Sequence, residues 1–407
     1  MAFHLPPLRR VCGGPPRPDE ISNLASALVK RMSSEKRRIR VLHLIDSLDL
    51  GGAQTALFAW LEAHDRSRFE VHLASMHGTP KSLFYERARS LRIPMILLSP
   101  QRWMPLYLFR LPLTLVVGRY DIVHCHLFAS NWLGKPLARV FGVPVVISED
   151  QCNDSFRTGS ALVTWIDSFA NRFADQIFAV SGSIRDYLVK FENVPADRIR
   201  VVPNGLPEKL AIEHRACSAK LIGGAGRLVP QKNFERFLRI ARVLQEIDSS
   251  YQFMIAGSGP LNKLLEKRAG ELGLKVEWLG AQPSLGRFFS SIDLFLLTSD
   301  FEGLPMTVLE ALQCGVPAAA MAVDGIREEF TDEIALLDPA SSDLELGQRI
   351  HALLQDRTEL SAQIQRGIEL VTRRFSARAR IREIEHEYLE LLLRKRGGNR
   401  SGVSVAS

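Results

Sequence analysis

The sequence predicts an α/β protein made of two domains, each with a parallel sheet flanked by helices. Its 407 residues are more than a single hydrophobic core usually organises. Short runs rich in β-branched residues alternate with amphipathic segments, which is the pattern of βαβ units. The alternation pauses at a polar stretch in the middle of the chain and then starts again, which indicates a second sheet.

The first domain is predicted over residues 39–207. Ser181 is expected to cap a helix, and Asn204 is expected to lie in a turn that leads out of the domain. Seven apolar runs supply the predicted strands, in the order IRVLHLID, EVHLAS, PMILL, DIVHCH, VPVVIS, QIFAV and IRVVP.

Residues 208–218 are polar and are interpreted as a linker to a second domain, residues 219–375. After its first strand, Phe234, Phe237, Leu238 and Leu244 fall on one face of a helix that Asn233 can cap. The predicted strands of this domain are AKLIGGAG, YQFMIAG, KVEWLG, IDLFLL, PAAAM and EIALL.

The chain ends in a predicted helix, residues 376–396, followed by a flexible tail, residues 397–407. Ile381, Ile384, Tyr388 and Leu391 form one apolar stripe of this helix, so we expect it to pack back on the body of the protein.

The formal charge of +7 is concentrated at the N-terminus, since residues 1–40 carry nine Lys or Arg and three Asp or Glu. The rest is nearly neutral, which argues against a nucleic-acid partner. Residues 1–38 are predicted to be a flexible basic extension, either a solvated tail or an arm that contacts an anionic membrane. The segment from Trp103 to Leu115 likewise has two interpretations, a membrane-surface segment or a helix covering the first sheet.

The five cysteines are scattered, and neither they nor the histidines show metal-ligand spacing. They are interpreted as reduced thiols of a cytoplasmic protein; peripheral attachment at the inner membrane face stays open. No signal peptide or membrane-spanning segment is predicted, because the longest apolar stretch, residues 106–118, is interrupted by Arg110.

Functional residues are sought in the loops that follow the strands, because ligands of open parallel sheets bind at the carboxyl ends of the strands. Gly51 and Gly52 follow the first strand and open a helix, where backbone amides can approach a phosphate closely. A plain turn is the alternative for this glycine pair.

Two cations occupy the loop GRLVPQKN of the second domain. Arg227 comes directly after a strand and Lys232 directly before a helix, so both can meet a diphosphate and stabilise its departure without a metal ion. The alternative is a pair of solvated loop cations.

The segment TSDFEGLPMTVLEALQCGVP carries two glutamates around the start of a predicted helix. Glu302 lies in the loop before the helix and Glu310 on its second turn, so one carboxylate can reach a sugar hydroxyl and the other a ribose. Amides near Gly303 and Leu304 would face the diphosphate. For an arbitrary pair, a surface helix residue and a loop acid are the ordinary alternative.

The two glutamates, with GLP between them and ALQCGVP after them, resemble the nucleotide-sugar signature of glycosyltransferase family 4. The resemblance extends over residues 39–394 through the segments LGGAQTAL, DIVHCHLFASN, ADQIFAVSGSIRDYL, VVPNGL, GRLVPQKN, IAGSGPL, VEWLG and RFS.

This resemblance implies a GT-B fold, two Rossmann-like domains facing across a cleft, with the acceptor on the first domain and the nucleotide sugar on the second. It further implies that Arg227 and Lys232 bind the donor diphosphate, Glu302 the donor sugar and Glu310 the ribose, and that Gly52 contacts phosphate or sugar. The implied activity is a metal-independent, retaining hexosyl transfer with no cofactor, in surface polysaccharide or glycolipid synthesis.

One position departs from the family pattern. Asp150 follows the strand VPVVIS where many members carry a histidine near the donor sugar, so the sugar contacts are expected to differ. A catalytically inactive sugar-nucleotide-binding protein is the alternative function, and a GT-B epimerase fits the paired glutamates less well. His126 has two interpretations, a substrate contact or a hydrogen-bonded structural residue.

Overall fold

The computed structural model describes residues 37–49, 51–78, 82–100, 105–151, 160–207 and 220–398. Nearly all of the predicted N-terminal extension and the whole predicted linker lie outside the described residues, as do Trp103, Cys12, Cys152, Cys217 and residues 399–407.

Two separate sheets confirm the predicted α/β class, and every strand pairing within them is parallel. The first sheet has the order β3-β2-β1-β4-β5-β6-β7 and the second β10-β9-β8-β11-β12-β13. The strands of the first are β1 (Ile39–Ser47), β2 (Phe69–His77), β3 (Met95–Leu97), β4 (Ile122–His126), β5 (Val145–Asp150), β6 (Gln176–Ala179) and β7 (Ile199–Val201). Those of the second are β8 (Leu221–Ala225), β9 (Gln252–Ala256), β10 (Val276–Gly280), β11 (Leu294–Leu297), β12 (Ala318–Met321) and β13 (Ala335–Leu337).

Helices cover both faces of the first sheet. One hydrophobic cluster joins the sheet to α2 and α16, and another joins its opposite face to α4 and α5. The helices between its strands are α2 (Gly52–Ala63), α3 (Leu83–Ser90), α4 (Tyr107–Gly118), α5 (Phe128–Val140), α7 (Ala161–Asn171), α8 (Gly182–Glu192) and the 3₁₀ turn η1 (Ala196–Arg198). Helix α4 turns Leu111 and Leu115 toward the sheet, which is the covering role that the sequence left as one alternative.

The second sheet is covered in the same way. Asn233 caps α9 as predicted, accepting a hydrogen bond from the amide of Arg236, and the apolar face of this helix is buried. Its helices are the 3₁₀ turn η2 (Pro230–Lys232), α9 (Phe234–Ile247), α10 (Asn262–Glu271), α11 (Gly286–Ser291), α12 (Met306–Gln313), α13 (Asp324–Glu329), α14 (Asp343–Gln355) and α15 (Arg357–Arg374).

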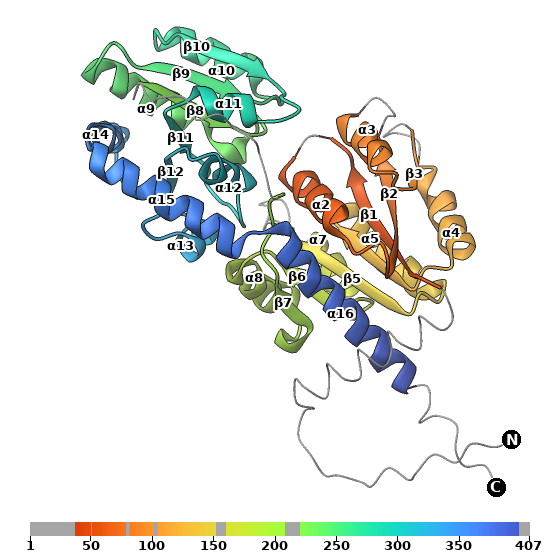
Figure 1. Cartoon of the computed structure of the whole chain (residues 1–407). Helices are drawn as coiled ribbons and strands as arrows, with labels where there is room; N and C mark the ends of the chain where they lie inside the picture. The colour runs from red at the N-terminus through yellow and green to blue at the C-terminus, as the bar shows by residue number, and fades with distance from the viewer. Residues whose placement is uncertain are drawn as a thin grey trace, which may run out of the picture.

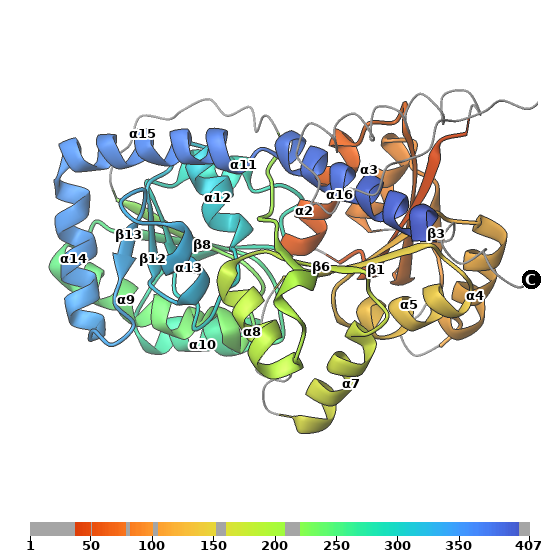
Figure 2. The same ribbon diagram turned by 90° about the horizontal axis from the view of Figure 1, so that it is seen from below.

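The last helix, α16 (Ala377–Gly398), leaves the second half and packs on the first. Figures 1 and 2 show α15 running along the second half and α16 continuing along the first. Ile381, Ile384, Tyr388 and Leu391 are buried in the same hydrophobic cluster as β1 and α2, which confirms the predicted stripe.

The two halves are in direct contact. The Glu328 carboxylate of α13 accepts hydrogen bonds from the backbone amides of Gly182 and Ser183, at 2.5 and 2.8 Å, where α8 begins. A carboxylate at a helix N-terminus is electrostatically favourable, so this contact helps to join the halves.

Candidate active site

The contacts between the halves involve loops that leave the carboxyl ends of strands. The loop after β1 meets the start of α12, and Gln151, directly after β5, meets the loop that precedes α12. Two sheets therefore present their strand ends to one another, which is where a ligand of parallel sheets is expected to bind.

Gly52 is the first residue of α2 and lies against the second half. A Cβ atom placed on it would be 3.3 Å from Cγ of Met306 in α12. Gly51 before it is extended, with φ −175°, and is the N-cap of α2. The small residue keeps the helix N-terminus close to the opposite half, where its free amides point at the interface.

Lys232 and Glu302 form an ion pair in the second half. The Lys232 ammonium lies 2.5 Å from Oε1 of Glu302, and the same oxygen accepts a 2.6 Å hydrogen bond from the Ser299 hydroxyl. Both charged side chains are mostly buried, at 14% and 7% exposure. The side chain predicted to bind the phosphate, Lys232, and the side chain predicted to bind the sugar, Glu302, are thus adjacent.

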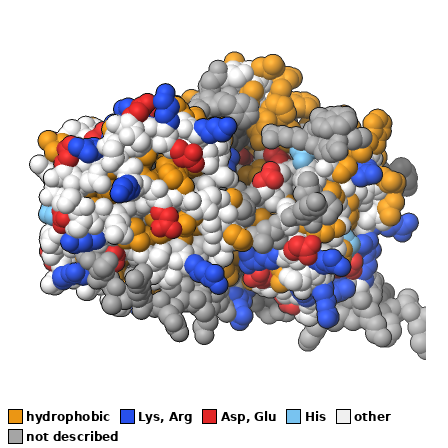
Figure 3. Space-filling view, turned by 90° about the horizontal axis from the view of Figure 1, so that it is seen from above, with side chains coloured by type: hydrophobic (Ala, Val, Ile, Leu, Met, Phe, Trp, Pro, Cys, Tyr) orange, Lys and Arg blue, Asp and Glu red, His pale blue; other side chains and the backbone are white. Residues whose placement is uncertain are grey.

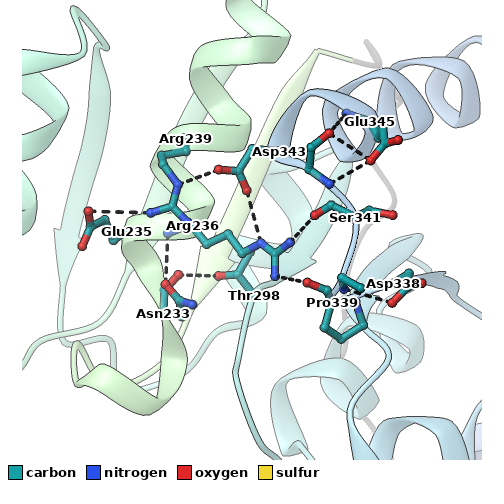
Figure 4. A network of polar contacts seen from close by, with 12 residues as sticks. Asn233, Glu235, Arg236, Arg239, Thr298, Asp338, Pro339, Ser341, Asp343 and Glu345 are labelled. Carbon is teal, nitrogen blue, oxygen red and sulfur yellow. Dashed lines mark hydrogen bonds and ion pairs between the residues drawn. The ribbon is translucent and has the colours of Figure 1, made fainter.

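The loop that carries Lys232 is held by a polar network shown in Figure 4. The Thr298 hydroxyl donates to the carbonyl oxygen of Asn233 at 3.0 Å, as Figure 4 shows. It also donates to the carbonyl oxygen of Lys232, at 3.2 Å. The Arg236 guanidinium donates to the carbonyl oxygens of Pro339 and Ser341, at 2.9 and 2.7 Å. These bonds tie the loop after β8 to the loops after β11 and β13, so the backbone of Lys232 is fixed.

Arg227 lies in the same loop as Lys232, but its side chain is exposed. It follows Gly226, whose φ of +153° lets the chain turn sharply out of β8. Within the described part of the chain its guanidinium makes no hydrogen bond or ion pair. Two bidentate donor edges are therefore open to a ligand.

Glu310 projects from the second turn of α12 and is half-buried. Burial raises the pKa of its carboxyl to about 7, and the Arg87 guanidinium of α3 in the first half acts in the opposite direction. Among the described residues its oxygens have no hydrogen-bond partner. A half-buried carboxyl without a partner is suited to accept hydrogen bonds from a ligand.

Gly303 and Leu304 lie between the two glutamates. A Cβ atom on Gly303 would be 2.3 Å from the carbonyl oxygen of Gln151, so only glycine allows the loop after β5 to approach this closely. Leu304 is buried. Neither backbone amide donates a hydrogen bond within the described part of the chain, so both are available to an anion.

Asp150 ends β5 and is buried beside a buried lysine. Burial lowers the pKa of Lys135, and Asp150 is the strongest of the negative charges that oppose this shift. Lys135 also donates a 2.5 Å hydrogen bond to Asn171. The acid at this position therefore neutralises a cation inside the first half, whatever else it contacts.

His126 is buried at the end of β4, with both ring nitrogens engaged. Its Nδ1 lies 2.6 Å from the Glu149 carboxylate and its Nε2 lies 2.9 Å from Nδ1 of His43. These contacts fit the structural alternative that the sequence left open, and a substrate contact by His126 stays a prediction. With His124, these histidines bring ring nitrogens within 4.8 Å of one another, a grouping that β1 and β4 create and that sequence spacing did not indicate.

Three site features were missed from the sequence. Ser299 binds Glu302, Gln151 abuts Gly303, and Glu328 caps α8 across the interface. Only Ser299 had a usable signal, its position inside the segment that carries Glu302; the other two are tertiary contacts between loops far apart in sequence.

Two family models match the chain. Glycosyltransferase Family 4 matches residues 50–209, and Glycosyl transferases group 1 matches residues 211–370. Together they cover well over half of the sequence. The chain therefore belongs to glycosyltransferase family 4, of the group 1 type.

Curated relatives agree with this assignment. The putative glycosyltransferase EpsF of Bacillus subtilis is 26% identical over 335 residues, covering 75% of this chain and 83% of that protein. An Escherichia coli UDP-Gal:α-D-GlcNAc-diphosphoundecaprenol α-1,3-galactosyltransferase is 26% identical over 330 residues, 74% of this chain and 84% of that enzyme. An uncharacterized glycosyltransferase of Methanocaldococcus jannaschii is 26% identical over 241 residues, 54% of this chain and 62% of that protein.

Among solved structures, Anabaena HepE in complex with UDP and glucose superposes with a TM-score of 0.74 and 18% identity. The match covers 86% of this chain and 99% of HepE. The fold is therefore GT-B, as the sequence resemblance implied. No described helix is both long and apolar enough to cross a membrane.

Proposed function

We propose that this protein is a retaining glycosyltransferase that moves a sugar from a nucleoside diphosphate sugar to an acceptor of surface polysaccharide or glycolipid synthesis. The observation that carries the proposal is a set of groups after the strands of the second sheet: the exposed Arg227 guanidinium, the Lys232–Glu302 ion pair and the half-buried Glu310 carboxyl, which has no hydrogen-bond partner among the described residues. Family membership supports the transferase class.

In this proposal, Arg227 and Lys232 hold the diphosphate together with the free amides of Gly303 and Leu304. Glu310 accepts hydrogen bonds from the ribose. Glu302, which Ser299 and Lys232 already orient, contacts a hydroxyl of the donor sugar. In this proposal, the cations and the carboxylates bind different parts of one extended ligand.

The proposed reaction breaks the bond between the sugar C1 and the diphosphate oxygen, and forms a bond from C1 to the acceptor oxygen on the same face. The acceptor proton passes to the departing phosphate. Fixed cations that meet the leaving charge lower the barrier by several kcal/mol in enzymes of this kind, about 3 for each well-placed donor. No metal ion or other cofactor is needed in this scheme, because Arg227 and Lys232 neutralise the diphosphate.

UDP is the proposed nucleoside diphosphate of the donor, because HepE binds UDP in the same fold. A lipid-linked acceptor is proposed because the E. coli relative acts on a diphosphoundecaprenol. The surface agrees with such an acceptor: exposed apolar side chains gather on the half of the first sheet, the right-hand half in Figure 3. The patch contains Leu108, Phe109, Leu113, Val116, Val117, Val140, Leu162 and Trp165.

Such a patch supports the proposal of peripheral contact with a membrane, and the proposed site of contact is the cytoplasmic face of the membrane that carries the acceptor. The basic residues 1–38 would add attraction to anionic lipid.

The test is a thermal-shift panel of UDP-, GDP-, ADP- and TDP-sugars with the wild type and with Arg227→Ala. We expect a UDP-sugar to raise the melting temperature of the wild type and not that of the variant. The matched control is Arg349→Ala, an exposed arginine on α14 away from the strand ends. If no nucleotide sugar stabilises the wild type, the proposed donor site is wrong. Stabilisation by a nucleotide sugar without any turnover would favour the inactive sugar-nucleotide-binding alternative.

Retention of configuration and metal independence are tested by analysing the product of the reaction and its turnover. With the stabilising donor and a diphosphoundecaprenol-linked acceptor, NMR of the product should show the anomeric configuration of the donor. Turnover should persist in EDTA; inversion of configuration, or loss of turnover restored by Mg²⁺ or Mn²⁺, would contradict the scheme.

A further inference from the structure

A continuous chain of buried hydrogen bonds runs through the first half, outside the proposed transfer site. It begins at Glu149 on β5 and passes through His126 on β4 and His43 on β1. It then reaches His64 after α2 and ends at Glu385 on α16. All five residues are at least 95% buried.

The contacts along this chain have hydrogen-bond distances. His126 Nδ1 lies 2.6 Å from Glu149 Oε2, and His43 Nδ1 lies 2.9 Å from His126 Nε2. His43 Nε2 lies 3.2 Å from His64 Nε2, and His64 Nδ1 lies 2.9 Å from Glu385 Oε1. Each imidazole thus uses both of its nitrogens, and a carboxylate lies at each end.

Counting protons along the chain gives a definite result. Four contacts need four hydrogens, one in each. A neutral imidazole carries a single N–H, so three neutral histidines supply three, and an ionised carboxylate supplies none. With three protons, one contact would join an imidazole lone pair to a carboxylate or to another lone pair, and the burial of both groups makes such a contact costly.

We infer that Glu149, His126, His43, His64 and Glu385 together hold one proton beyond those of three neutral imidazoles and two ionised carboxylates, and that this proton fastens α16 to β5 beside the candidate site. The inference does not depend on the proposed function. The proton belongs to the chain as a whole, since shifting each hydrogen across its own contact moves the positive charge from one end to the other.

The surroundings favour the extra positive charge at the two ends of this hydrogen-bond chain over its middle. Burial, together with the neighbouring imidazoles His126, His124 and His64, lowers the pKa of His43 well below the usual value. The 2.6 Å contact between His126 and Glu149 is short, as charge-assisted hydrogen bonds are. The extra positive charge therefore resides beside a carboxylate.

Other polar groups lie around this hydrogen-bond chain, and among the described residues two of their buried atoms, His124 Nε2 and Trp60 Nε1, have no hydrogen-bond partner. Gln151, directly after β5, donates to Glu149, and the amide of Asp65 donates to Glu385. His124 on β4 and the Tyr388 hydroxyl on α16 bond to each other at 2.7 Å. Burial lowers the pKa of His124 well below its usual value, and burial followed by the charges of Glu385 and Glu149 raises that of Tyr388 well above its own. Neither residue supplies the missing proton at neutral pH.

The consequence is a proton that folding takes up. Well above the ordinary histidine pKa of about 6.5, unfolded histidines and glutamates are nearly all deprotonated, so the folded state binds almost one proton more than the unfolded state. The contribution to stability is fully present below about pH 6.5, the ordinary histidine value, and is lost as the pH rises.

The experiment compares full-length wild type with Glu385→Gln. The glutamine amide can donate the fourth N–H to His64 Nδ1, so that variant needs no extra proton, although the Asp65 amide then loses the oxygen that accepts its hydrogen bond. Between pH 7.0 and 8.0 we expect the unfolding equilibrium constant of the wild type to rise about tenfold more per pH unit than that of the variant. The difference between the pH slopes of the two proteins cancels the contribution of the Cys125 and Cys314 thiols, which also release protons on unfolding.

Glu387→Gln on the same helix is the matched control, because Glu387 is buried but paired with Arg200 instead. It should keep the wild-type pH slope. If Glu385→Gln does not fold, Glu149→Gln makes the same change at the other end of the chain. Equal slopes for wild type and the folded variant would overturn the inference.

A second measurement uses the native protein. With ¹⁵N-labelled histidine, the wild type should show one imidazolium signal at pH 8 that is missing in Glu385→Gln. A stoichiometric Zn²⁺ bound at His43, His124 and His126, found by elemental analysis of protein purified without chelator, would also overturn the inference, because a metal ion displaces the protons counted here.

Discussion

Lys232 and Glu302 neutralise each other, with 2.5 Å between the ammonium and the carboxylate oxygen. A diphosphate that enters the site therefore meets an ammonium already in use and shares it with Glu302. The pair brings leaving-group contact and sugar contact to one point, so movement of either side chain affects both.

Removing only one member of this pair should be costly. Lys232→Met leaves the buried Glu302 carboxylate with the Ser299 hydroxyl alone, and we expect a loss of about 3 kcal/mol in the free energy of unfolding. The double variant Lys232→Met/Glu302→Gln should recover most of that loss while staying inactive. Urea denaturation gives both values; additive effects would show that the two side chains do not interact.

Arg227 offers a cleaner separation of binding from folding. Because its guanidinium is exposed and makes no contact with the described residues, Arg227→Ala should leave the urea midpoint unchanged. A lost charge-assisted contact is worth about 1.5–3 kcal/mol, so donor affinity should fall roughly tenfold to a hundredfold. Calorimetric titration with the stabilising nucleotide sugar measures this, with Arg349→Ala as the control. Unchanged affinity would remove Arg227 from the site.

Glu310 predicts a pH-dependent stability difference. Its folded pKa of about 7 lies above the ordinary 4.5, so the folded state holds the proton more tightly between these values. Wild-type stability should therefore fall, relative to Glu310→Gln, by about 1–3 kcal/mol as the pH rises from 4.5 to 8, with the two proteins closest at low pH. Parallel stability curves would show that the carboxyl is not desolvated.

The same variant should bind donor more weakly. Ribose hydroxyls donate more strongly to a carboxylate than to an amide, so Glu310→Gln should raise the donor dissociation constant about tenfold at pH 8, whereas Glu302→Gln should mainly lower kcat. Kinetics that are unchanged in both variants would place the cleft elsewhere.

Asp150 has a consequence for the fold as well as for the sugar. Asp150→His should change donor choice or rate if this position meets the sugar, and it should also destabilise the protein by about 1–3 kcal/mol, because Lys135 loses its strongest opposing charge. Lys135→Met in the same chain should restore part of the stability. A donor profile that matches the wild type would remove Asp150 from the site.

Membrane contact is tested separately from catalysis. Deleting residues 1–38 should weaken binding to anionic vesicles and leave binding to neutral vesicles nearly unchanged, because the net positive charge of the protein is concentrated in that segment. Vesicle flotation at two salt concentrations measures this. Unchanged binding to anionic vesicles would exclude a role for the segment.

The sequence predicted the strands well, because each buried parallel strand is a short apolar run, such as LFLL in β11, bounded by helical segments. It also predicted local caps, since Asn233 and Ser181 bond to amides three residues ahead. These features depend on neighbours in the chain.

The sequence did not predict which side chains pair across the fold. Lys232 and Glu302 are 70 positions apart, and His64 and Glu385 are 321 apart, so no local pattern links them. The resemblance to a family supplied roles for residues. The pairing of Lys232, the proposed phosphate-binding residue, with Glu302, the proposed sugar-binding residue, depends on how the loops after β8 and β11 meet.

Because α16 completes the hydrophobic core of the first half, that core cannot close during translation before α16 has been made. Helix α16 supplies Ile381, Ile384 and Tyr388 to a core that otherwise comes from residues before position 203. A ribosome-bound first half would therefore expose an unfilled apolar groove until α16 has been made. Separate expression of the two halves would likewise leave this groove open in one product and a bare apolar helix on the other.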